Sequence, residues 1–374
     1  MSEWPMVKLG DLGEFINGFA FKPSDWSEDG TPIIRIQNLT NPQALFNRTT
    51  KRVKDVLYVE PGDLLVSWSA TLGVFRWQGK ERAVLNQHIF KVVSKPIIEN
   101  EFLEFSLKFA LQQVEKYLHG ATMRHVNRQE FLDLKIPLPP LGEQKRIAEI
   151  LGGVSKAIHV VEQQIETANQ LEKSLFNQFR RQYSALCSPI KNICKVQTGA
   201  TPSRKNSAYY DGGIPWVKTG EVNGGKIEET EEYITELAVQ ETNCRKFPIG
   251  TILVAMYGQG ATRGKVGILN CAAATNQACA ALIALACEDQ EYIFAVLRNC
   301  YDELRNLGRG GTQPNLNLTL VKNFEIPWPE EFAREEFSQK WRELDNLRHL
   351  LHRKLSLLQE LQKSLANRAF AGLL

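Results

Sequence analysis

The 374-residue sequence has neither a strong excess of one charge nor a long apolar run. Lysine and arginine number 45 and aspartate and glutamate 42, which leaves a net charge of only +3. This balance excludes a polycationic binder and an acidic mimic of DNA. The most apolar segment, residues 272–287, is shorter than the roughly 20 residues of a membrane-spanning helix, and the N-terminus lacks the pattern of a signal peptide. We therefore expect no membrane association.

Cysteine pairs of the type CxxC are also missing. The seven cysteines are odd in number and all lie in the second half of the chain. Their spacing argues against a disulfide framework and against a zinc ribbon. We therefore predict reduced thiols, a cytoplasmic location and no metal site.

The short motifs of common catalytic sites are absent as well. The sequence contains no GxxxxGK[ST] phosphate loop, no HExxH zinc motif and no GxSxG nucleophile motif. It also lacks the Asn/Asp-Pro-Pro-aromatic tetrapeptide of amino-methyltransferases, and Gly258, Gly260 and Gly264 miss the GxGxxG spacing. These absences predict a protein that binds rather than catalyses and that holds no cofactor of its own.

The sequence does contain a long internal repeat. Asn86-Gln87 recurs as Asn276-Gln277, 190 residues later. The same offset relates residues 136–139 to 326–329 and residues 171–175 to 361–365. Towards the N-terminus the offset shrinks by a few residues, which small loop insertions explain. A constant offset across separated blocks predicts a tandem duplication of one unit of about 190 residues.

The first part of each copy has the composition of short strands and turns. Residues 32–36 and 63–67 are β-rich runs bounded by glycine or proline, and residues 214–218 and 251–256 are their second copies. Helical spacing follows at residues 102–117 and 292–304, before prolines end each part. We predict an α+β fold with two mixed α/β heads, at residues 1–140 and 186–330.

The second part of each copy has no proline and a heptad pattern of apolar residues, over 143–183 and 335–371. At about 1.5 Å per residue, each helix would be about 55–60 Å long. The predicted seam residues are Ile147, Leu151, Val154, Ile158, Val161, Ile165, Leu171 or Leu175, Leu344, Leu347, Leu351, Leu355, Leu358, Leu361 or Gln362, and Leu365.

Each apolar stripe must be buried against a partner. The simplest arrangement pairs the two long helices, at residues 141–185 and 331–374, as an antiparallel coiled coil that joins the heads. The alternative is that each helix packs separately on its own head.

Both heads carry basic, amide and aromatic residues at turn-like positions after their strands. Arginine and lysine neutralise phosphates, while arginine, glutamine and asparagine can read base edges through paired hydrogen bonds. We therefore predict contact with double-stranded DNA. The candidate residues are Arg35, Gln37, Ser67, Trp68, Arg76, Asn86, Gln87 and Arg124 in the first head, and Lys218, Thr219, Tyr257, Gln259, Arg263, Lys265, Asn276, Gln277 and Gln313 in the second.

A glycine starts the equivalent strand of each copy, at Gly62 and Gly250, and the sequence IPLPPLGEQKRI at 136–147 leads into the first long helix. In these features the whole chain resembles the specificity subunits of type I restriction-modification systems. The second copy departs from this junction, because Ile326-Pro327-Trp328-Pro329 is not followed by Glu-Gln.

The resemblance implies that each head is a target recognition domain for one half of a split, asymmetric DNA sequence. It further implies that the helices set the gap between the halves and dock two modification (methyltransferase) subunits, which carry S-adenosylmethionine. Restriction (motor-nuclease) subunits would join them. From the residues alone, two other functions stay open: a two-headed protein-interaction scaffold on a helical spacer, and an enzyme whose site has no known motif.

Overall fold

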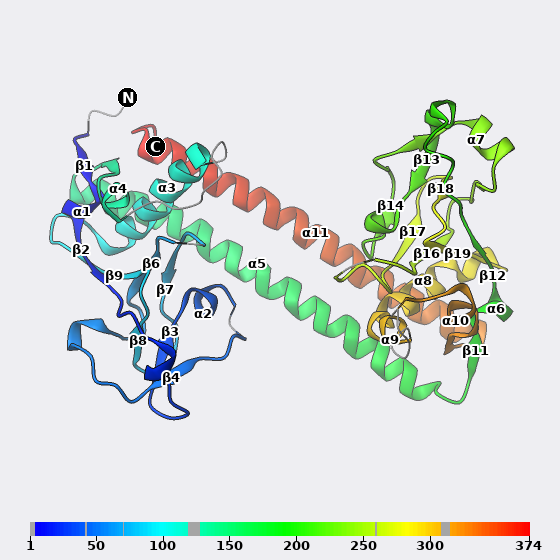
Figure 1. The fold of residues 1–374 in the computed structure, drawn as a ribbon, viewed down its shortest axis with the longest axis horizontal. Helices are drawn as coiled ribbons and strands as arrows, with labels where there is room; N and C mark the ends of the chain where they lie inside the picture. Colours follow the sequence, from blue (N-terminus) through cyan, green and yellow to red (C-terminus); the bar gives the residue numbers. More distant parts are fainter. Residues whose placement is uncertain (1–3, 42, 70, 119–127, 259, 308–314) are drawn as a thin grey trace. The chain divides into compact units, whose positions relative to one another are not determined.

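The computed structural model describes residues 4–41, 43–69, 71–118, 128–258, 260–307 and 315–374 (Figure 1). The chain forms two compact units. Unit 1 contains Met1–Gln163 together with Arg353–Leu374, and unit 2 contains Gln164–His352. Each unit therefore combines one head with parts of both long helices.

Unit 1 contains three small sheets. Their strands, in sheet order, are β1 (Met6–Lys8) and β10 (Lys135–Pro137); β2 (Gly13–Asn17), β9 (Ile89–Ser94), β6 (Leu64–Ser67) and β7 (Gly73–Arg76); and β4 (Asn47–Thr49), β3 (Thr31–Ile34), β8 (Ala83–Leu85) and β5 (Tyr58–Val59). Strands β3 and β8 are parallel, whereas the other pairs are antiparallel. The helices of this head are α1 (Leu9–Leu12), α2 (Ile36–Thr40), α3 (Asn100–Leu118) and α4 (Arg128–Leu132).

Unit 2 repeats most of this topology. Its strands, in sheet order, are β11 (Cys187–Pro189) and β20 (Glu325–Pro327); β12 (Cys194–Thr198), β19 (Cys279–Ala284), β16 (Ile252–Ala255), β17 (Val266–Leu269) and β14 (Lys226–Ile227); and β15 (Tyr233–Ile234), β13 (Tyr210–Val217) and β18 (Ala274–Thr275). The helices are α6 (Ile190–Ile193), α7 (Glu236–Glu241), α8 (Gln290–Asn299), α9 (Tyr301–Asn306) and α10 (Leu318–Asn323). The order β12-β19-β16-β17 matches β2-β9-β6-β7, so the duplication extends to the strand pairing, with β14 added to the larger sheet and one strand fewer in the sheet around β13.

The predicted strands lie within one to four residues of β3, β6, β13 and β16. The helix predicted over residues 292–304 is divided into α8 and α9 at Cys300. The Cys300 N–H bonds to both Val296 O and Leu297 O, which tightens the last turn of α8 and redirects the chain.

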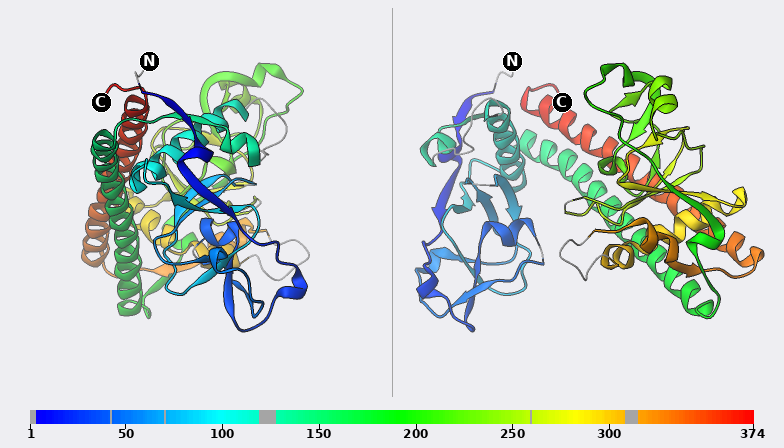
Figure 2. Two further views of the ribbon diagram at one scale, coloured as in Figure 1. Left: turned by 90° about the vertical axis from the view of Figure 1, so that its left-hand side faces the viewer. Right: turned by 45° about the vertical axis from the view of Figure 1, so that its right-hand side comes forward.

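The two long helices are α5 (Leu141–Gln182) and α11 (Glu331–Phe370), and they lie side by side in each view (Figures 1 and 2). In unit 1 they run antiparallel, because Ser155 Oγ accepts a 2.7 Å hydrogen bond from Gln362 and Leu374 O accepts a 2.8 Å bond from Arg146. In unit 2 the rings of Phe179 and Phe337 are 4.5 Å apart. The predicted pairing of the helices is therefore present within each unit.

The helices also pack on the heads, each with its far end on the other copy's head. In unit 1, Phe370 of α11 stacks on Phe109 of α3 with ring centroids 4.4 Å apart. In unit 2, Phe179 of α5 contacts Tyr292 of α8 at 5.9 Å. The alternative in which each helix packs separately on its own head is wrong, because both units combine helix–helix and helix–head contacts in one core.

Most of the predicted seam is correct. Ile147, Leu151, Val161, Ile165 and Leu351 are buried, and Val154, Ile158, Leu344, Leu355, Leu358 and Leu365 are half-buried. Leu171, Leu347 and Leu361 are exposed. The prediction of Leu347 is therefore wrong, whereas the alternatives given for the other two, Leu175 and Gln362, are half-buried. The neighbouring polar residues Glu172, Arg348 and Gln362 turn inward instead.

Glu172, of which only 6% of the surface is exposed, is the centre of a buried ion network in unit 2. Its carboxylate accepts hydrogen bonds from Trp341 Nε1 at 2.9 Å, from Asn299 Nδ2 at 3.3 Å and from the Arg348 guanidinium. Asp345 binds Arg348 at 2.8 Å and Arg298 at 2.9 Å. Three helices, α5, α8 and α11, are therefore held together by side chains whose charges are mutually satisfied.

The junction between each head and its long helix uses equivalent positions in different ways. Gln144 is 1% exposed; its amide binds Pro139 O at 2.8 Å and Ile97 O at 3.1 Å, and it accepts from the Glu99 N–H at 2.8 Å. Arg334 takes this place in unit 2, where it binds Pro329 O at 2.7 Å and Asp289 at 2.8 Å. The departure from Glu-Gln in the second copy thus conserves the contact with the proline carbonyl.

We expect Glu172→Ala to lower the free energy of unfolding by about 3–5 kcal/mol, because it leaves buried arginine without its full set of partners. Urea unfolding followed by circular dichroism measures the loss. The matched control is Glu166→Ala, an exposed glutamate on the same helix and in the same unit. Equal losses in the two variants would contradict the role assigned to the network.

Candidate nucleic-acid interface

In unit 1, several of the predicted DNA-binding residues meet where strands β3, β6 and β8 end. The Asn86 N–H bonds to Ile34 O at 3.0 Å, which places Asn86 beside Arg35 at the end of β3. The Trp68 N–H bonds to His88 O at 3.3 Å, which brings the residue after β6 to the same turn. We refer to Arg35, Gln37, Trp68, Asn86, Gln87 and His88 as the unit 1 strand-end cluster.

The same hydrogen bonds occur in unit 2. The Asn276 N–H bonds to Val217 O at 3.1 Å, and the Met256 N–H bonds to Ala278 O at 2.9 Å. These bonds bring Lys218, Thr219, Tyr257, Asn276 and Gln277 together as the unit 2 strand-end cluster. Side chains that differ between the copies therefore occupy one conserved backbone frame, which is how loops on a rigid scaffold carry specificity.

A glycine makes each frame possible. An added Cβ on Gly18 would stand 2.0 Å from Asn86 O, and one on Gly199 would stand 1.7 Å from Thr275 O. Both distances are far below contact distance, so the segment after β2 or β12 can approach the Asn-Gln turn only without a side chain. Gly18 and Gly199 therefore play the same part in the two copies.

Several of the predicted DNA-binding side chains are engaged with other groups of the protein. Arg76 forms a 2.6 Å ion pair with Glu104, and β7 places it opposite Leu64, at the other end of the sheet from the cluster. Lys218 binds Glu231 at 2.8 Å and Glu232 at 3.0 Å. The Arg35 guanidinium lies 5.7 Å from the centre of the Trp26 ring. The Ser67 hydroxyl is buried and donates to Thr71 O.

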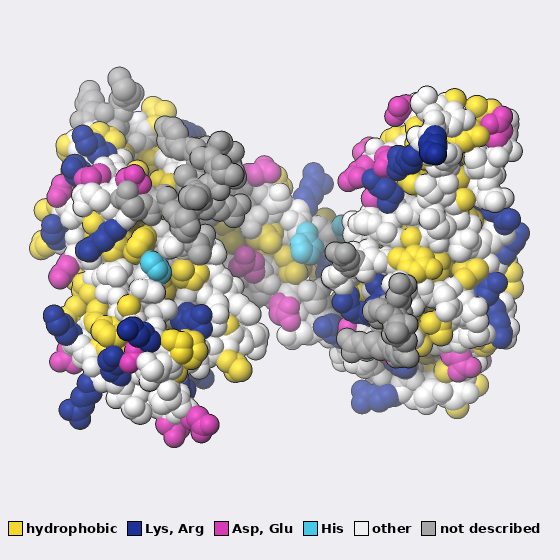
Figure 3. Space-filling view, viewed as in Figure 1, with side chains coloured by type: hydrophobic (Ala, Val, Ile, Leu, Met, Phe, Trp, Pro, Cys, Tyr) yellow, Lys and Arg dark blue, Asp and Glu magenta, His cyan; other side chains and the backbone are white. Residues whose placement is uncertain are grey.

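The remaining candidates are more accessible. Gln37, Gln87 and Gln277 are exposed, and Tyr257 is 39% exposed. Arg263 and Lys265 are half-buried, and both lie in the loop between Tyr257 and the first residue of β17. Arg124, Gln259 and Gln313 lie outside the described residues. On the face of unit 1 seen in Figure 3, lysine and arginine alternate with acidic and apolar side chains rather than forming one continuous patch.

The sequence did not single out His88 of the unit 1 cluster, nor Asn17, which precedes Gly18. His88 has φ of 71°, which is uncommon for a residue other than glycine, and its Nδ1 is buried without a hydrogen-bond partner among the described residues. Asn17 Oδ1, Asn86 Oδ1 and Trp68 Nε1 are likewise buried without a hydrogen-bond partner among the described residues. Unpaired buried polar atoms are costly, and ordered water or a bound group would supply the partners that these four atoms lack. The positive φ could not have been read from the sequence.

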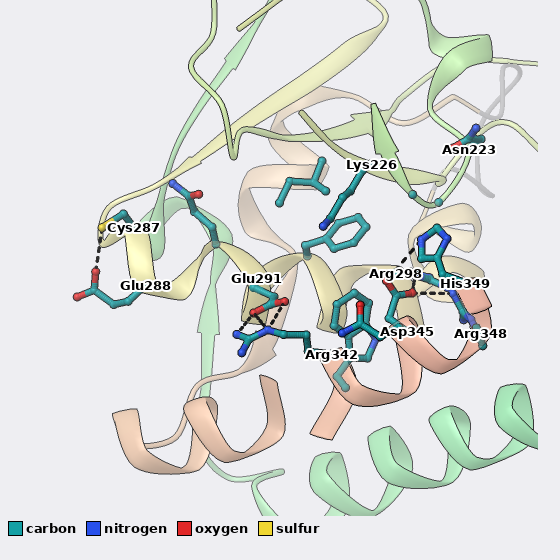
Figure 4. Close-up of a pocket in the computed structure, with 17 residues that line it drawn as sticks. Asn223, Lys226, Cys287, Glu288, Glu291, Arg298, Arg342, Asp345, Arg348 and His349 are labelled. Atoms are coloured by element: carbon teal, nitrogen blue, oxygen red, sulfur yellow. Dashed lines mark hydrogen bonds and ion pairs between the residues drawn. The ribbon is translucent and has the colours of Figure 1, made fainter. Parts of the chain in front are cut away.

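Unit 2 also contains a cavity of about 530 Å³ between α8, α11 and the turn at Asn223–Lys226 (Figure 4). Three of its charged side chains, Arg298, Asp345 and Arg348, belong to the ion network. Arg342 binds Glu291 at 2.9 Å, and Asp345 is bound by Arg298 and Arg348. Since arginine holds Glu291 and Asp345, neither of these two carboxylates is free to act as a general base.

The described residues include no group of three or more His, Cys, Asp or Glu side chains able to hold a metal ion. All seven cysteines are free thiols, and burial raises the pKa of Cys194, Cys279 and Cys300 to about 12. No helix in the described ranges has the length and apolar character to span a membrane.

Comparison with solved structures defines the class of the fold. The S subunit of a type I restriction-modification system from M. genitalium aligns with a TM-score of 0.61 over 98% of this chain and 96% of that chain, at 14% identity. A structure from a study of assembly and conformational transition of the type I R-M system aligns with a TM-score of 0.57, at 13% identity over 99% and 98% of the two chains. The fold is that of type I specificity subunits.

The sequence comparisons give the family. The family model described as "Type I restriction modification DNA specificity domain" matches the chain twice, at residues 1–170 and 187–359. The chain therefore belongs to this family. The MjaVIII specificity subunit of Methanocaldococcus jannaschii is 23% identical, over 99% of this chain and 92% of its own length. The EcoBI specificity subunit of Escherichia coli is 28% identical over 46% of this chain and 36% of its own. The two matches of the family also confirm the internal repeat.

We expect Gly18→Ala to displace the Asn-Gln turn of unit 1 and to lower both the thermal midpoint and the affinity for duplex DNA. The methyl group would overlap Asn86 O, so the backbone must move. Gly153→Ala is the control, because nothing lies within 4 Å of its added Cβ. That helix substitution should stabilise the protein by up to about 1 kcal/mol. Unchanged melting and binding in Gly18→Ala would refute the close approach.

Proposed function

We propose that this chain is the sequence-specific DNA-binding subunit of a type I restriction-modification complex. The observation that carries the proposal is the strand-end cluster, which occurs twice on the same backbone frame with different side chains. The amide groups of Gln37, Gln87 and Gln277 are exposed at these turns and are able to hydrogen-bond base edges in the major groove. The family match supports DNA as the ligand.

The differences between the clusters predict an asymmetric, bipartite target. Unit 1 offers Trp68 and His88, whereas unit 2 has Met256 and Ala278 at the equivalent positions and adds Tyr257. Side chains that differ in donors, acceptors and size favour different bases. Each head would therefore read its own half-site, and neither half-site would be a copy of the other.

In this proposal the paired helices set the distance between the half-sites. Helices α5 and α11 contain 42 and 40 residues, or about 60 Å each at 1.5 Å per residue. One to two turns of DNA, at about 34–36 Å per turn, correspond to a spacer of this order. The same helices would dock two modification (methyltransferase) subunits, and restriction (motor-nuclease) subunits would complete the complex.

The catalytic steps would belong to those partners. S-adenosylmethionine would be bound by the modification subunits and not by this chain, which we propose to be non-catalytic. A role on DNA together with reduced cysteines would fit a cytoplasmic location. The competing function is a protein-interaction scaffold with two heads, and such a scaffold would show no salt-dependent binding to DNA.

The purified chain with its modification partner should select a bipartite motif from a library of random duplexes in an electrophoretic shift experiment. Binding should weaken steeply between about 50 and 200 mM salt, because phosphate contacts release counterions. Selection of one contiguous motif, or of none, would count against the proposal. Gln87→Ala and Gln277→Ala should each relax the motif in a different half, which identifies the head that reads it.

Lengthening both helices by one heptad should widen the gap between the half-sites and leave their sequences unchanged. One heptad is inserted after Ala168 in α5 and the other in α11 between Arg348 and Leu351, which keeps Glu172 opposite Arg348. Seven residues add about 10 Å, or about three base pairs. The methylation pattern in cells that carry the variant reports the new gap.

The control for the gap experiment is the α5 insertion alone. It moves Glu172 by two turns relative to Arg348 and should destabilise the pair instead of lengthening it. A changed half-site sequence after the paired insertion would contradict the hypothesis that the helices act as a spacer.

A further inference from the structure

Unit 1 has a second feature that the strand-end cluster does not use. A cavity of about 490 Å³ opens between the end of α2, the loop that carries Phe46, and the segment from Phe75 to Gly79 that ends β7. This volume is within the range of small-molecule sites. The cavity adjoins the cluster through α2, because Gln37 and Asn38 are consecutive residues of that helix.

The walls of this cavity are aromatic. Phe46, Phe75 and Trp77 line it, and the rings of Phe46 and Trp77 meet edge to face with centroids 6.0 Å apart. Phe46 is 37% exposed and Trp77 is 7% exposed, so one ring is accessible at the opening and the other forms the interior. Such an arrangement suits a flat ligand that can stack.

Two polar groups in the cavity wall have unused hydrogen-bonding capacity. Trp77 Nε1 is buried and has no partner in the described part of the chain. It lies beside Gly79, where an added Cβ would stand 2.9 Å from the nitrogen, so the backbone of Gly79 packs closely against the edge of the indole. Gln78 is exposed, and its amide can both donate and accept hydrogen bonds.

The charge of the lining excludes several ligands. None of the residues that line the cavity is acidic, and Arg76 is the only charged one among them. A cationic ligand is therefore disfavoured. A neutral, flat ring with acceptor atoms on its edge matches the stacking walls, the free indole N–H and the free amide together.

We propose that this cavity accepts a nucleobase displaced from the DNA stack. The proposal rests on the DNA-binding function proposed above and adds a second mode of contact in unit 1. Proteins that hold unstacked bases use aromatic faces for stacking and a few polar groups for the base edge. Unit 2 lacks the equivalent aromatic residues, because the strand register places Gly267 and Leu269 where unit 1 has Phe75 and Trp77. The site therefore serves one half of the target only.

The test compares two duplexes of the same sequence, of which one carries a single bulged thymidine. A bulged nucleotide is already unpaired, so little energy is needed to place it in a pocket. The full-length chain should bind the bulged duplex about 5-fold to about 100-fold more tightly than the perfect duplex, the range expected for stacking of one base on aromatic side chains. Fluorescence anisotropy at fixed salt measures both affinities.

The variants separate the cavity from the rest of the surface. Phe46→Ala should abolish the preference for the bulged duplex, and Trp77→Phe, which keeps a ring but removes the donor, should reduce it. Leu45→Ala is the matched control, since Leu45 is 88% exposed and does not line the cavity. A thermal melt of each variant verifies folding, and the milder Trp77→Phe variant tests the cavity if Phe46→Ala melts early.

Three outcomes overturn the proposal. The first is equal binding of the two duplexes by the wild-type chain, and the second is a preference that Phe46→Ala retains. The third is binding of a neutral phenylalanine-rich peptide that depends on Phe46 without any preference for the bulge, which would assign the cavity to a partner protein. Motif selection from perfect duplexes is measured in parallel. If it persists, only the cavity proposal fails; if it is absent, the proposed DNA function fails as well.

Discussion

The buried ion network around Glu172 is the interaction on which the arrangement within unit 2 depends. It places one carboxylate from α5 between Trp341 and Arg348 of α11 and Asn299 of α8. Apolar side chains along a heptad seam can slide by one heptad and still be buried, but a buried charge has only one position at which its partners meet it. The network therefore fixes the register of the two helices and attaches the head of unit 2 to them through α8.

The sequence was informative about the architecture because the architecture is periodic at two scales. The offset of 190 residues predicted the duplication, and the heptads predicted α5 and α11 to within a few residues. Leu347 was chosen because it is apolar, yet its polar neighbour Arg348 turns inward and meets Glu172 of the other helix. A pattern of hydrophobicity cannot reveal that two distant polar residues satisfy each other.

The candidate interface was predictable in position but not in chemistry. The repeat located the turns at Asn86 and Asn276, and the structure joins them to the ends of β3 and β13 by matching hydrogen bonds. Basic residues were nominated by charge alone, and two of them are neutralised by carboxylates remote in sequence: Arg76 by Glu104 and Lys218 by Glu231 and Glu232. The amide side chains at the turns are the exposed part of the clusters, and the positive φ of His88 has no signature in the sequence.

Glu172 and Gln362 occupy equivalent positions of the two copies, but their partners have diverged with them. Gln362 bonds to the neutral Ser155, whereas Glu172 bonds to Arg348, and Asp345 stands where the first copy has Ser155. Two first copies paired with each other would bury Glu172 against serine and isoleucine, and two second copies would bury Arg348 and Asp345 near glutamine. The duplication has thereby lost its interchangeability: each half is now chemically complementary to the other half and no longer to itself.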